Sequence, residues 1–276
     1  MGEVRVITPG HASEVWHLVT SRPIDNIVVA SKMEEFGVNR ARSGIDLVGY
    51  WENNHLISVL CDGPNLQPMN ATEEALDAFS NYVEYRRCIS ILGVREESLG
   101  LWDRLCQRSF TQWASPREVR DHQKVMTLSS PPSIAPNLSV RPLQTRHLDS
   151  YLQAAISMYT EEVGVAPQNP MGTYRDHVGT LMMKGRTFGV LEGTRVVFKA
   201  DIVATVSGIC QIGGVWLAEE YRGKGLSAGL VSGVINLCQE RFSTVSLYVN
   251  PYNHPAVRCY ESLGFTQVSE CATIMY

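Results

Sequence analysis

The chain has 276 residues, of which 44% are hydrophobic and 19% are charged, and its formal net charge is −4. This length suits two globular domains, and the mild negative charge argues against a general nucleic-acid binder. The N-terminus has no apolar leader and no run of eighteen apolar residues occurs, so we expect neither secretion nor a membrane span. The seven cysteines form no Cys-x-x-Cys pair, which predicts a reduced, cytoplasmic protein without a structural zinc or other metal site.

The first half of the chain alternates segments typical of strands and helices. Apolar, β-branched residues predict a first strand at 4–7, followed by helix-forming sequence. Next we expect a strand pair at 47–51 and 56–61, joined by a turn at 52–54. A strand at 88–92 and a helix at 96–106 follow.

A proline-rich segment divides the chain. Residues 129–137 contain three prolines and three serines, which cannot continue a helix or a central strand. We therefore predict an N-terminal domain at 1–128, a linker at 129–137 and a C-terminal domain at 138–276.

The second half predicts a mixed α/β sheet with helices on both faces. The expected order is strand, two helices, three strands, helix, strand, helix and strand. The segments are a strand at 140–143, a helix at 148–159, strands at 188–191, 196–205 and 210–217, a strand at 246–250 and a closing strand pair at 265–275.

A basic glycine turn at 221–227 lies between the strand at 210–217 and an amphipathic helix. The first amides of a helix lack intrahelical partners, and the helix dipole favours negative charge there. Glycines at 223 and 225 let a ligand approach the backbone, while Arg222 and Lys224 add positive charge. The turn predicts a phosphate or pyrophosphate site, although it has neither the Walker nor the Rossmann spacing.

The turn resembles the phosphate loop of the GNAT superfamily of N-acetyltransferases, Arg/Gln-x-x-Gly-x-Gly/Ala. Arg222 and Gly225 match, and Ser227 replaces the last small residue of the pattern. A second GNAT pattern, Asn-x-x-Ala-x-x-x-Tyr-x-x-x-Gly-Phe, is matched downstream at Asn253, Ala256, Tyr260, Gly264 and Phe265. The resemblance covers about residues 138 to 276.

The resemblance implies acetyl-CoA as the donor and a primary amine, from a small molecule or a peptide, as the acceptor. It implies direct attack in a ternary complex, with Tyr260 as the general acid toward the coenzyme A sulfur. The implied acetyl-CoA contacts are Val215, Trp216, Leu217, Arg222, Gly223, Lys224, Gly225, Leu226, Ser227, Asn253, Ala256 and Tyr260. No nucleic-acid or membrane partner is implied.

The general base is open at this point. GNAT enzymes often use a glutamate on the fourth strand, but here residues 211–215 read Gln-Ile-Gly-Gly-Val. Asp201 is one candidate; it follows Lys199 at strand spacing and alternatively forms only a surface ion pair with it. Glu161 and Glu162, after the first helix, are others, and a water wire without a dedicated base is a further alternative.

The first half echoes the second, which predicts a tandem of two GNAT-like domains. Its stretch at 63–69 contains two prolines and no basic residue, so it is a poor phosphate cradle. This half also resembles an uncharacterised domain fused to GNAT domains in actinobacterial proteins, through segments at 49–51, 63–66, 101–102 and 116–120. We expect it to be non-catalytic: a scaffold, a wall of the substrate cleft or an oligomer surface, as in a homodimer.

Two functions stay open from the sequence. One is an acetyl-CoA-dependent N-acetyltransferase, favoured because Tyr260 accompanies the phosphate loop. The other is a non-catalytic acyl-CoA-binding sensor or adaptor, favoured by the missing carboxylate on the fourth strand.

Overall fold

The computed structural model describes residues 2–108 and 112–276. Contacts divide the chain into two compact units: unit 1 comprises residues 1–125, 248–252 and 267–276, and unit 2 comprises residues 126–247 and 253–266. Each unit is a mixed, mostly antiparallel sheet flanked by helices, which confirms the predicted tandem α/β architecture.

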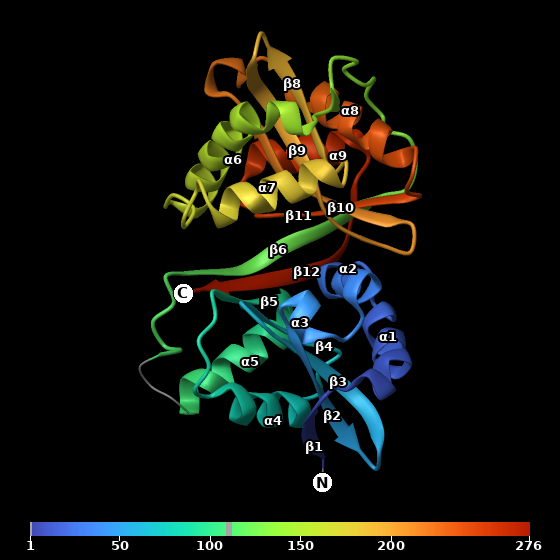
Figure 1. Ribbon diagram of the computed structural model, residues 1–276, viewed down its shortest axis with the longest axis vertical. Helices are drawn as coiled ribbons and strands as arrows, with labels where there is room; N and C mark the ends of the chain where they lie inside the picture. The colour runs from blue at the N-terminus through green and yellow to red at the C-terminus, as the bar shows by residue number, and fades with distance from the viewer. Residues whose placement is uncertain (1, 109–111) are drawn as a thin grey trace. The chain divides into compact units, whose positions relative to one another are not determined.

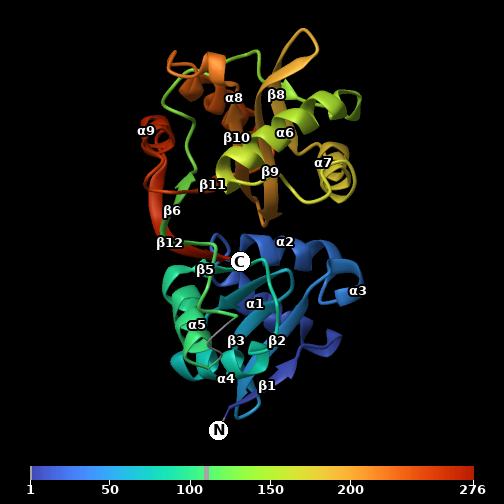
Figure 2. The same cartoon turned by 90° about the vertical axis from the view of Figure 1, so that its left-hand side faces the viewer.

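Unit 1 has the strand order β1-β2-β3-β4-β5-β12. The first three pairings are antiparallel, β4 and β5 are parallel, and β5 is antiparallel to β12. Helices α1, α2 and α3 lie on one side of its strands, and α4 and α5 lie on the other (Figures 1 and 2). The elements are β1 Glu3–Val6, α1 Ala12–Thr20, α2 Ile27–Phe36, α3 Arg40–Ser43, β2 Asp46–Glu52, β3 His55–Asp62, β4 Asn65–Met69, α4 Glu73–Val83, β5 Ser90–Val94, α5 Arg95–Arg108 and β6 Glu118–Leu128, which continues into unit 2.

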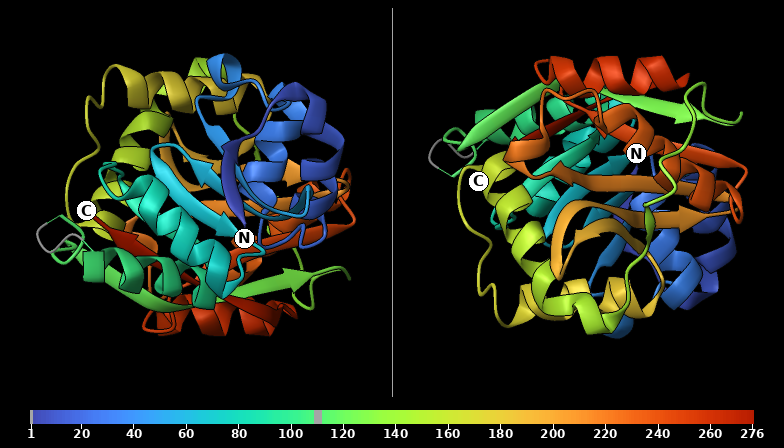
Figure 3. Two further views of the ribbon diagram at one scale, coloured as in Figure 1. Left: turned by 90° about the horizontal axis from the view of Figure 1, so that it is seen from below. Right: turned by 90° about the horizontal axis from the view of Figure 1, so that it is seen from above.

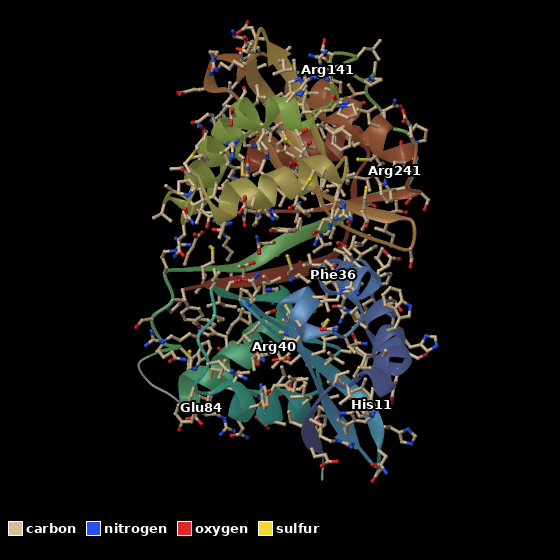
Figure 4. All side chains as sticks on the ribbon, in the orientation of Figure 1. His11, Phe36, Arg40, Glu84, Arg141 and Arg241 are labelled. Atoms are coloured by element: carbon tan, nitrogen blue, oxygen red, sulfur yellow. The ribbon has the colours of Figure 1, made fainter. Side chains whose placement is uncertain are left out.

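Unit 2 repeats this pattern in the order β7-β8-β9-β10-β11, with three antiparallel pairings followed by one parallel pairing. Helices α6 and α7 cover one face of its sheet, and α8 and α9 cover the other (Figure 3, right). The elements are β7 Arg141–Pro142, α6 Leu148–Val163, α7 Thr173–Met183, β8 Thr187–Glu192, β9 Arg195–Val206, β10 Ile209–Leu217, α8 Ser227–Gln239, β11 Thr244–Val249 and α9 His254–Leu263. The last strand, β12 Thr266–Met275, then returns the chain to unit 1. Figure 4 marks the edge strand β7 by Arg141.

Each unit has an apolar core between helices and sheet. In unit 1, Phe79 of α4 and Leu101 of α5 are fully buried against Leu60 and Ile91 of the strands. In unit 2, Leu152 of α6 packs with Val178 of α7 and Val196 of β9. The helical spacing of these apolar residues explains why the helices bury one face each.

Two elements differ from the expectations. Residues Asn65–Met69, in the stretch that was compared with the phosphate loop, form a strand, β4. Pro68 is tolerated because the parallel pairing with β5 is confined to Asn65 and Leu66, so no β5 partner needs its missing N–H. The predicted strand pair at 265–275 is instead the single strand β12, whose residues from Cys271 onward pair with β5.

The proline-rich segment packs along unit 2. The amide of Ser133 donates to the Leu263 carbonyl at 3.1 Å, and the amide of Asn137 donates to the Gly229 carbonyl at 2.8 Å. The segment therefore satisfies its backbone groups against the ends of α8 and α9 although it belongs to neither.

Candidate active site

Strand β10 carries a bulge in the middle of unit 2. Gly213 lies opposite Asp201 and Trp216 lies opposite Lys199, so Gly214 and Val215 together face the single residue between them on β9. Gly214 has φ +56°, a left-handed conformation that favours glycine. A bulge of this kind leaves an extra residue outside the ladder and redirects the strand.

Beyond the bulge, β10 also leaves its parallel neighbour. The register with β11 runs from Ile209 opposite Thr244 to Gln211 opposite Ser246, and the rest of β10 extends past it. Val215 has no counterpart in the β9 register or in the β11 register. Val215 therefore lies at a point where an extended ligand can add to the strand.

The glycine turn follows β10 and leads into α8. Gly223 and Gly225 both have φ +72°, and a Cβ at either position would meet no atom within 4 Å. Helix α8 has no side-chain cap at its start, where Leu226 is the N-cap residue and Ser227 is the first helical residue. The loop thus presents backbone amides, open space and a helix N-terminus together, which suits a pyrophosphate.

Arg222 ties this loop to the strand before it. Its Nε donates to the Leu217 carbonyl at 2.7 Å, and its Nη2 lies 2.7 Å from Oε2 of Glu161 on α6. The other carboxylate oxygen of Glu161 accepts from Trp216 Nε1 at 2.9 Å. Glu161, named among the base candidates, therefore holds the loop and the strand end, and the exposure of this ion pair keeps its energy small. The ammonium of Lys224 lies over the Tyr221 ring, 5.7 Å from its centroid.

Helix α9 carries the second sequence pattern. The Asn253 side chain caps the helix by accepting from the Ala256 amide at 3.2 Å, and Gly264 ends it with φ +100°. Tyr260 is buried and its ring packs edge-on against Phe265, with 5.8 Å between centroids. Burial raises the pKa of Tyr260, and the charges of Cys259 and Glu162 raise it further. Its phenol therefore stays protonated at neutral pH, as a proton donor must.

Asp201 and Lys199 face the same side of β9, as the sequence predicted, and the Lys199 ammonium lies 2.6 Å from Asp201 Oδ2. The alternative of a surface ion pair is wrong, because Lys199 is 0% exposed and Asp201 is 7% exposed. The second carboxylate oxygen of Asp201 accepts from the Tyr151 hydroxyl of α6 at 2.5 Å. Sequence spacing could reveal the pair but could not reveal the helix that covers it.

Three further titratable side chains lie on α6 and α7. Glu162 lies exposed at the end of α6, and its charge contributes to raising the pKa of Tyr174, after burial and Asp201. The ring of His177 on α7 lies beside that of Tyr174, with 6.5 Å between centroids. Partial desolvation lowers the pKa of His177, with Asp201 opposing and Lys199 reinforcing the shift. Sequence reasoning assigned no role to Tyr174 or His177, since neither belongs to a motif; the packing of α7 against α6 is what brings Tyr174 within reach of the charge of Glu162.

No helix in ranges 2–108 and 112–276 is long and apolar enough to cross a bilayer. Across the same ranges, no three His, Cys, Asp or Glu side chains are grouped to hold a metal ion.

Family models match both halves of the chain. Residues 148–265 match the acetyltransferase (GNAT) family, and residues 45–151 match a domain of unknown function (DUF4081). A mycothiol acetyltransferase from Corynebacterium aurimucosum is 44% identical over 57 residues. That match covers 20% of this chain and only 19% of the relative, so it describes a segment and not the whole protein.

Solved structures share the fold along almost the whole chain. A GNAT-family acetyltransferase from Colwellia psychrerythraea is 12% identical with a TM-score of 0.60, over 99% of both chains. A tandem GNAT protein from the clavulanic acid biosynthesis pathway is 11% identical with a TM-score of 0.59, over 100% of this chain and 98% of the other. Both are likenesses of fold. They show two GNAT-like folds in tandem, and the second of these, at residues 148–265, is the part of the chain that matches the acetyltransferase (GNAT) family.

Proposed function

We propose that the protein is an acetyl-CoA-dependent N-acetyltransferase that moves an acetyl group to a primary amine by direct attack in a ternary complex. The observation that carries this proposal is the junction of a bulged β10 with an open glycine loop at the start of α8. Both lie in the same unit as the buried phenol of Tyr260.

The loop and the strand would divide acetyl-CoA binding between them. Backbone amides of residues 222–227 would hold the pyrophosphate, with Lys224 supplying positive charge. The part of β10 at Val215, Trp216 and Leu217 would pair with the pantetheine arm as an added strand. On α9, Asn253 and Ala256 would line the same ligand; Asn253 keeps its amide nitrogen for this because its oxygen caps the helix.

The chemistry requires three events. The acceptor ammonium loses a proton, its nitrogen then attacks the thioester carbonyl carbon, and the carbon–sulfur bond breaks while the nitrogen loses a second proton and the sulfur gains one, which gives an amide and the thiol of coenzyme A. The Val215 N–H would donate to the thioester oxygen, and Tyr260 would protonate the departing sulfur.

Candidates for the base are Glu162, His177 and Asp201. The depressed pKa of His177 favours its neutral, proton-accepting form at pH 7, and the charge of Glu162 reaches the Tyr260 side of the site. Asp201 is the poorest acceptor of the three, because both of its oxygens already accept from buried groups.

The runner-up function is a non-catalytic acyl-CoA sensor or adaptor. The observation that favours it is the absence of a carboxylate from β10, which reads Ile209–Leu217 without aspartate or glutamate. Such a protein would use the same loop to bind acyl-CoA and would need none of the base candidates.

An amine screen separates these functions. Acetyl-CoA is incubated with wild type and with panels of small-molecule and peptide amines, and released thiol is measured. Amine-dependent release that falls in Tyr260→Phe supports the enzyme. Tight acetyl-CoA binding with no release across the panels supports the sensor. A Lys184→Gln variant, altered at the end of α7 outside the proposed machinery, is the matched control.

A further inference from the structure

A lysine without solvent contact lies beneath the bulge of β10. Lys199 is 0% exposed, and its ammonium donates to Asp201 Oδ2 at 2.6 Å and to the Gly214 carbonyl at 2.8 Å. The ammonium also lies over the Tyr151 ring, 5.3 Å from its centroid. A buried charge is costly unless it is paired and hydrogen-bonded, so this arrangement fixes the lysine closely.

Tyr151 and Gly214 pack closely against the Lys199–Asp201 ion pair. Tyr151 is fully buried; its hydroxyl donates to Asp201 Oδ1 at 2.5 Å, and the Ala200 carbonyl oxygen lies 3.1 Å from the same hydroxyl. A Cβ on Gly214 would lie 2.7 Å from both Asp201 Oδ2 and Lys199 Nζ. Only glycine therefore fits at the bulge while the lysine holds its carbonyl.

The carbonyl that Lys199 holds belongs to a particular peptide group. The C=O of Gly214 and the N–H of Val215 are the two ends of one planar amide. A charged hydrogen bond at the oxygen draws electron density along the amide and makes its N–H a stronger donor. The same bond fixes the direction in which that N–H points, because the peptide plane cannot rotate while its oxygen is held.

We propose that Lys199, held by Asp201 and Tyr151, orients and polarises the Gly214–Val215 peptide so that the Val215 N–H becomes a strong, fixed donor to the acyl carbonyl oxygen. This role rests on the proposed function, since it needs an acyl thioester beside Val215. Lys199 is a positioning residue, because it acts through the peptide and does not touch the acyl group. Asp201 then serves to neutralise and aim the lysine instead of accepting the proton of the amine.

A positioning role for Lys199 and a purely structural role have different consequences for the bound ligand. A structural pair would change stability and leave the bound acyl group unaffected. A polarised peptide weakens the C=O bond of the bound thioester, which lowers its stretching frequency. Coenzyme A lacks that carbonyl, so its affinity should be insensitive to the lysine.

The test is difference infrared spectroscopy of acetyl-CoA carrying a ¹³C-labelled acetyl carbonyl, bound to the full-length protein. The main variant is Lys199→Met/Asp201→Asn, which removes both charges together and avoids leaving one buried and unpaired. Tyr151→Phe is the milder second variant, because it leaves the lysine bonded to Gly214. The matched control is Arg175→Met/Asp149→Asn, which removes an ion pair of 2.6 Å from the surface of the same unit. Thermal melting and the Kd for coenzyme A establish that each variant is folded.

We expect the carbonyl band to move to higher frequency in the double variant, by less in Tyr151→Phe and not at all in the control. The Kd for coenzyme A should stay within about twofold, while acetyl transfer falls on the order of tenfold to a hundredfold, less than the loss of a whole oxyanion donor. An unshifted band in a folded double variant overturns this inference alone. If the double variant fails to fold, an unshifted band in Tyr151→Phe overturns it. Wild type that binds coenzyme A but shows no perturbed carbonyl band overturns the inference, and wild type that binds neither compound overturns the proposed function as well.

Discussion

The two units share one fold but differ in the connection between a central strand and the helix that follows it. In unit 2 nine residues, 218–226, join β10 to α8, whereas in unit 1 only three residues, 70–72, join β4 to α4. The short connection ends at Thr72, whose side chain accepts from the Ala75 amide at 3.2 Å and so satisfies the helix start internally. Glu73 and Glu74 then add negative charge to the first turn, which opposes a phosphate.

The strands before these connections differ as well. Between β3 and β4 the register runs without a shift from Asp62 opposite Leu66 to Val59 opposite Met69, so unit 1 has no counterpart of the β10 bulge. Helix α5, the counterpart of α9, contains no tyrosine. The two units thus share the sheet pattern and differ in a loop, a bulge and one phenol, which are the features on which the proposed ligand binding by unit 2 depends.

Removing the phenol of Tyr260 should give the largest loss that the comparison predicts. In Tyr260→Phe the departing sulfur has no proton donor, and acetyl transfer should fall about 10²- to 10⁴-fold, with the Kd for acetyl-CoA little changed. Steady-state kinetics with the best amine of the screen measure it. A variant that keeps more than half of the wild-type rate contradicts the assignment of Tyr260 as the acid.

Filling the bulge should have the next largest effect. In Gly214→Ala the new Cβ would crowd Lys199 and Asp201 at 2.7 Å, at a backbone φ of +56°. We expect a loss of about 1–3 kcal/mol in the free energy of unfolding and at least a tenfold loss of rate. Gly213→Ala, one residue earlier, is the matched control, because its Cβ would meet Val203 at 3.1 Å and its φ is not positive. Equal effects of the two substitutions on rate would contradict the importance of the bulge.

Unit 1 should respond to pH through a buried carboxyl group. Burial raises the pKa of Glu97 to about 7, although Arg22, at 2.8 Å, opposes the shift. Because the native state holds this proton more tightly than the unfolded chain, the free energy of unfolding should fall as pH rises from about 4.5 to 7. Glu97→Gln should flatten that dependence, which urea unfolding at several pH values measures. A slope that persists in the variant would assign the dependence to other groups.

The smallest effect is expected at the closed connection of unit 1. Thr72→Ala removes the cap of α4 and should lower the free energy of unfolding by about 1 kcal/mol. Acetyl-CoA affinity should not change, because this helix start is not a ligand site on our account. Calorimetric melting measures the stability, and ligand titration measures the acetyl-CoA affinity. Weakened acetyl-CoA binding in Thr72→Ala would contradict the expectation that the start of α4 takes no part in ligand binding.

Local patterns predicted much of this architecture, and long-range contacts account for the rest. The spacing of glycines and the apolar stripe of α8 predicted a loop before a helix, because both depend on neighbours in sequence. The bridge from Glu161 to Arg222 spans 61 residues, and the pairing of Cys271 with Val94 joins the last strand of the chain to a strand of its first half. No local period encodes such contacts.

Some residues of the candidate site could likewise be predicted from local sequence patterns, and others could not. Asn253, Tyr260 and the loop residues follow from a motif, whereas the burial of Lys199 depends on Tyr151, 48 residues earlier on another element. The strand β4 was not predicted, because its stretch was compared with the phosphate loop of the second half; Pro68 is acceptable in it because it lies beyond the last pair with β5.

The most direct test of the central claim is isothermal titration of acetyl-CoA into wild type and Gly225→Glu. Gly225 lies in open space at φ +72°, so glutamate there would put bulk and negative charge into the proposed pyrophosphate cradle and strain the loop. Glu73→Gln, at the other helix start, serves as the control. We predict that wild type and the control bind and that Gly225→Glu does not. Binding that is equal in all three proteins, or absent from wild type with acetyl-CoA and longer acyl-CoAs, would contradict the account.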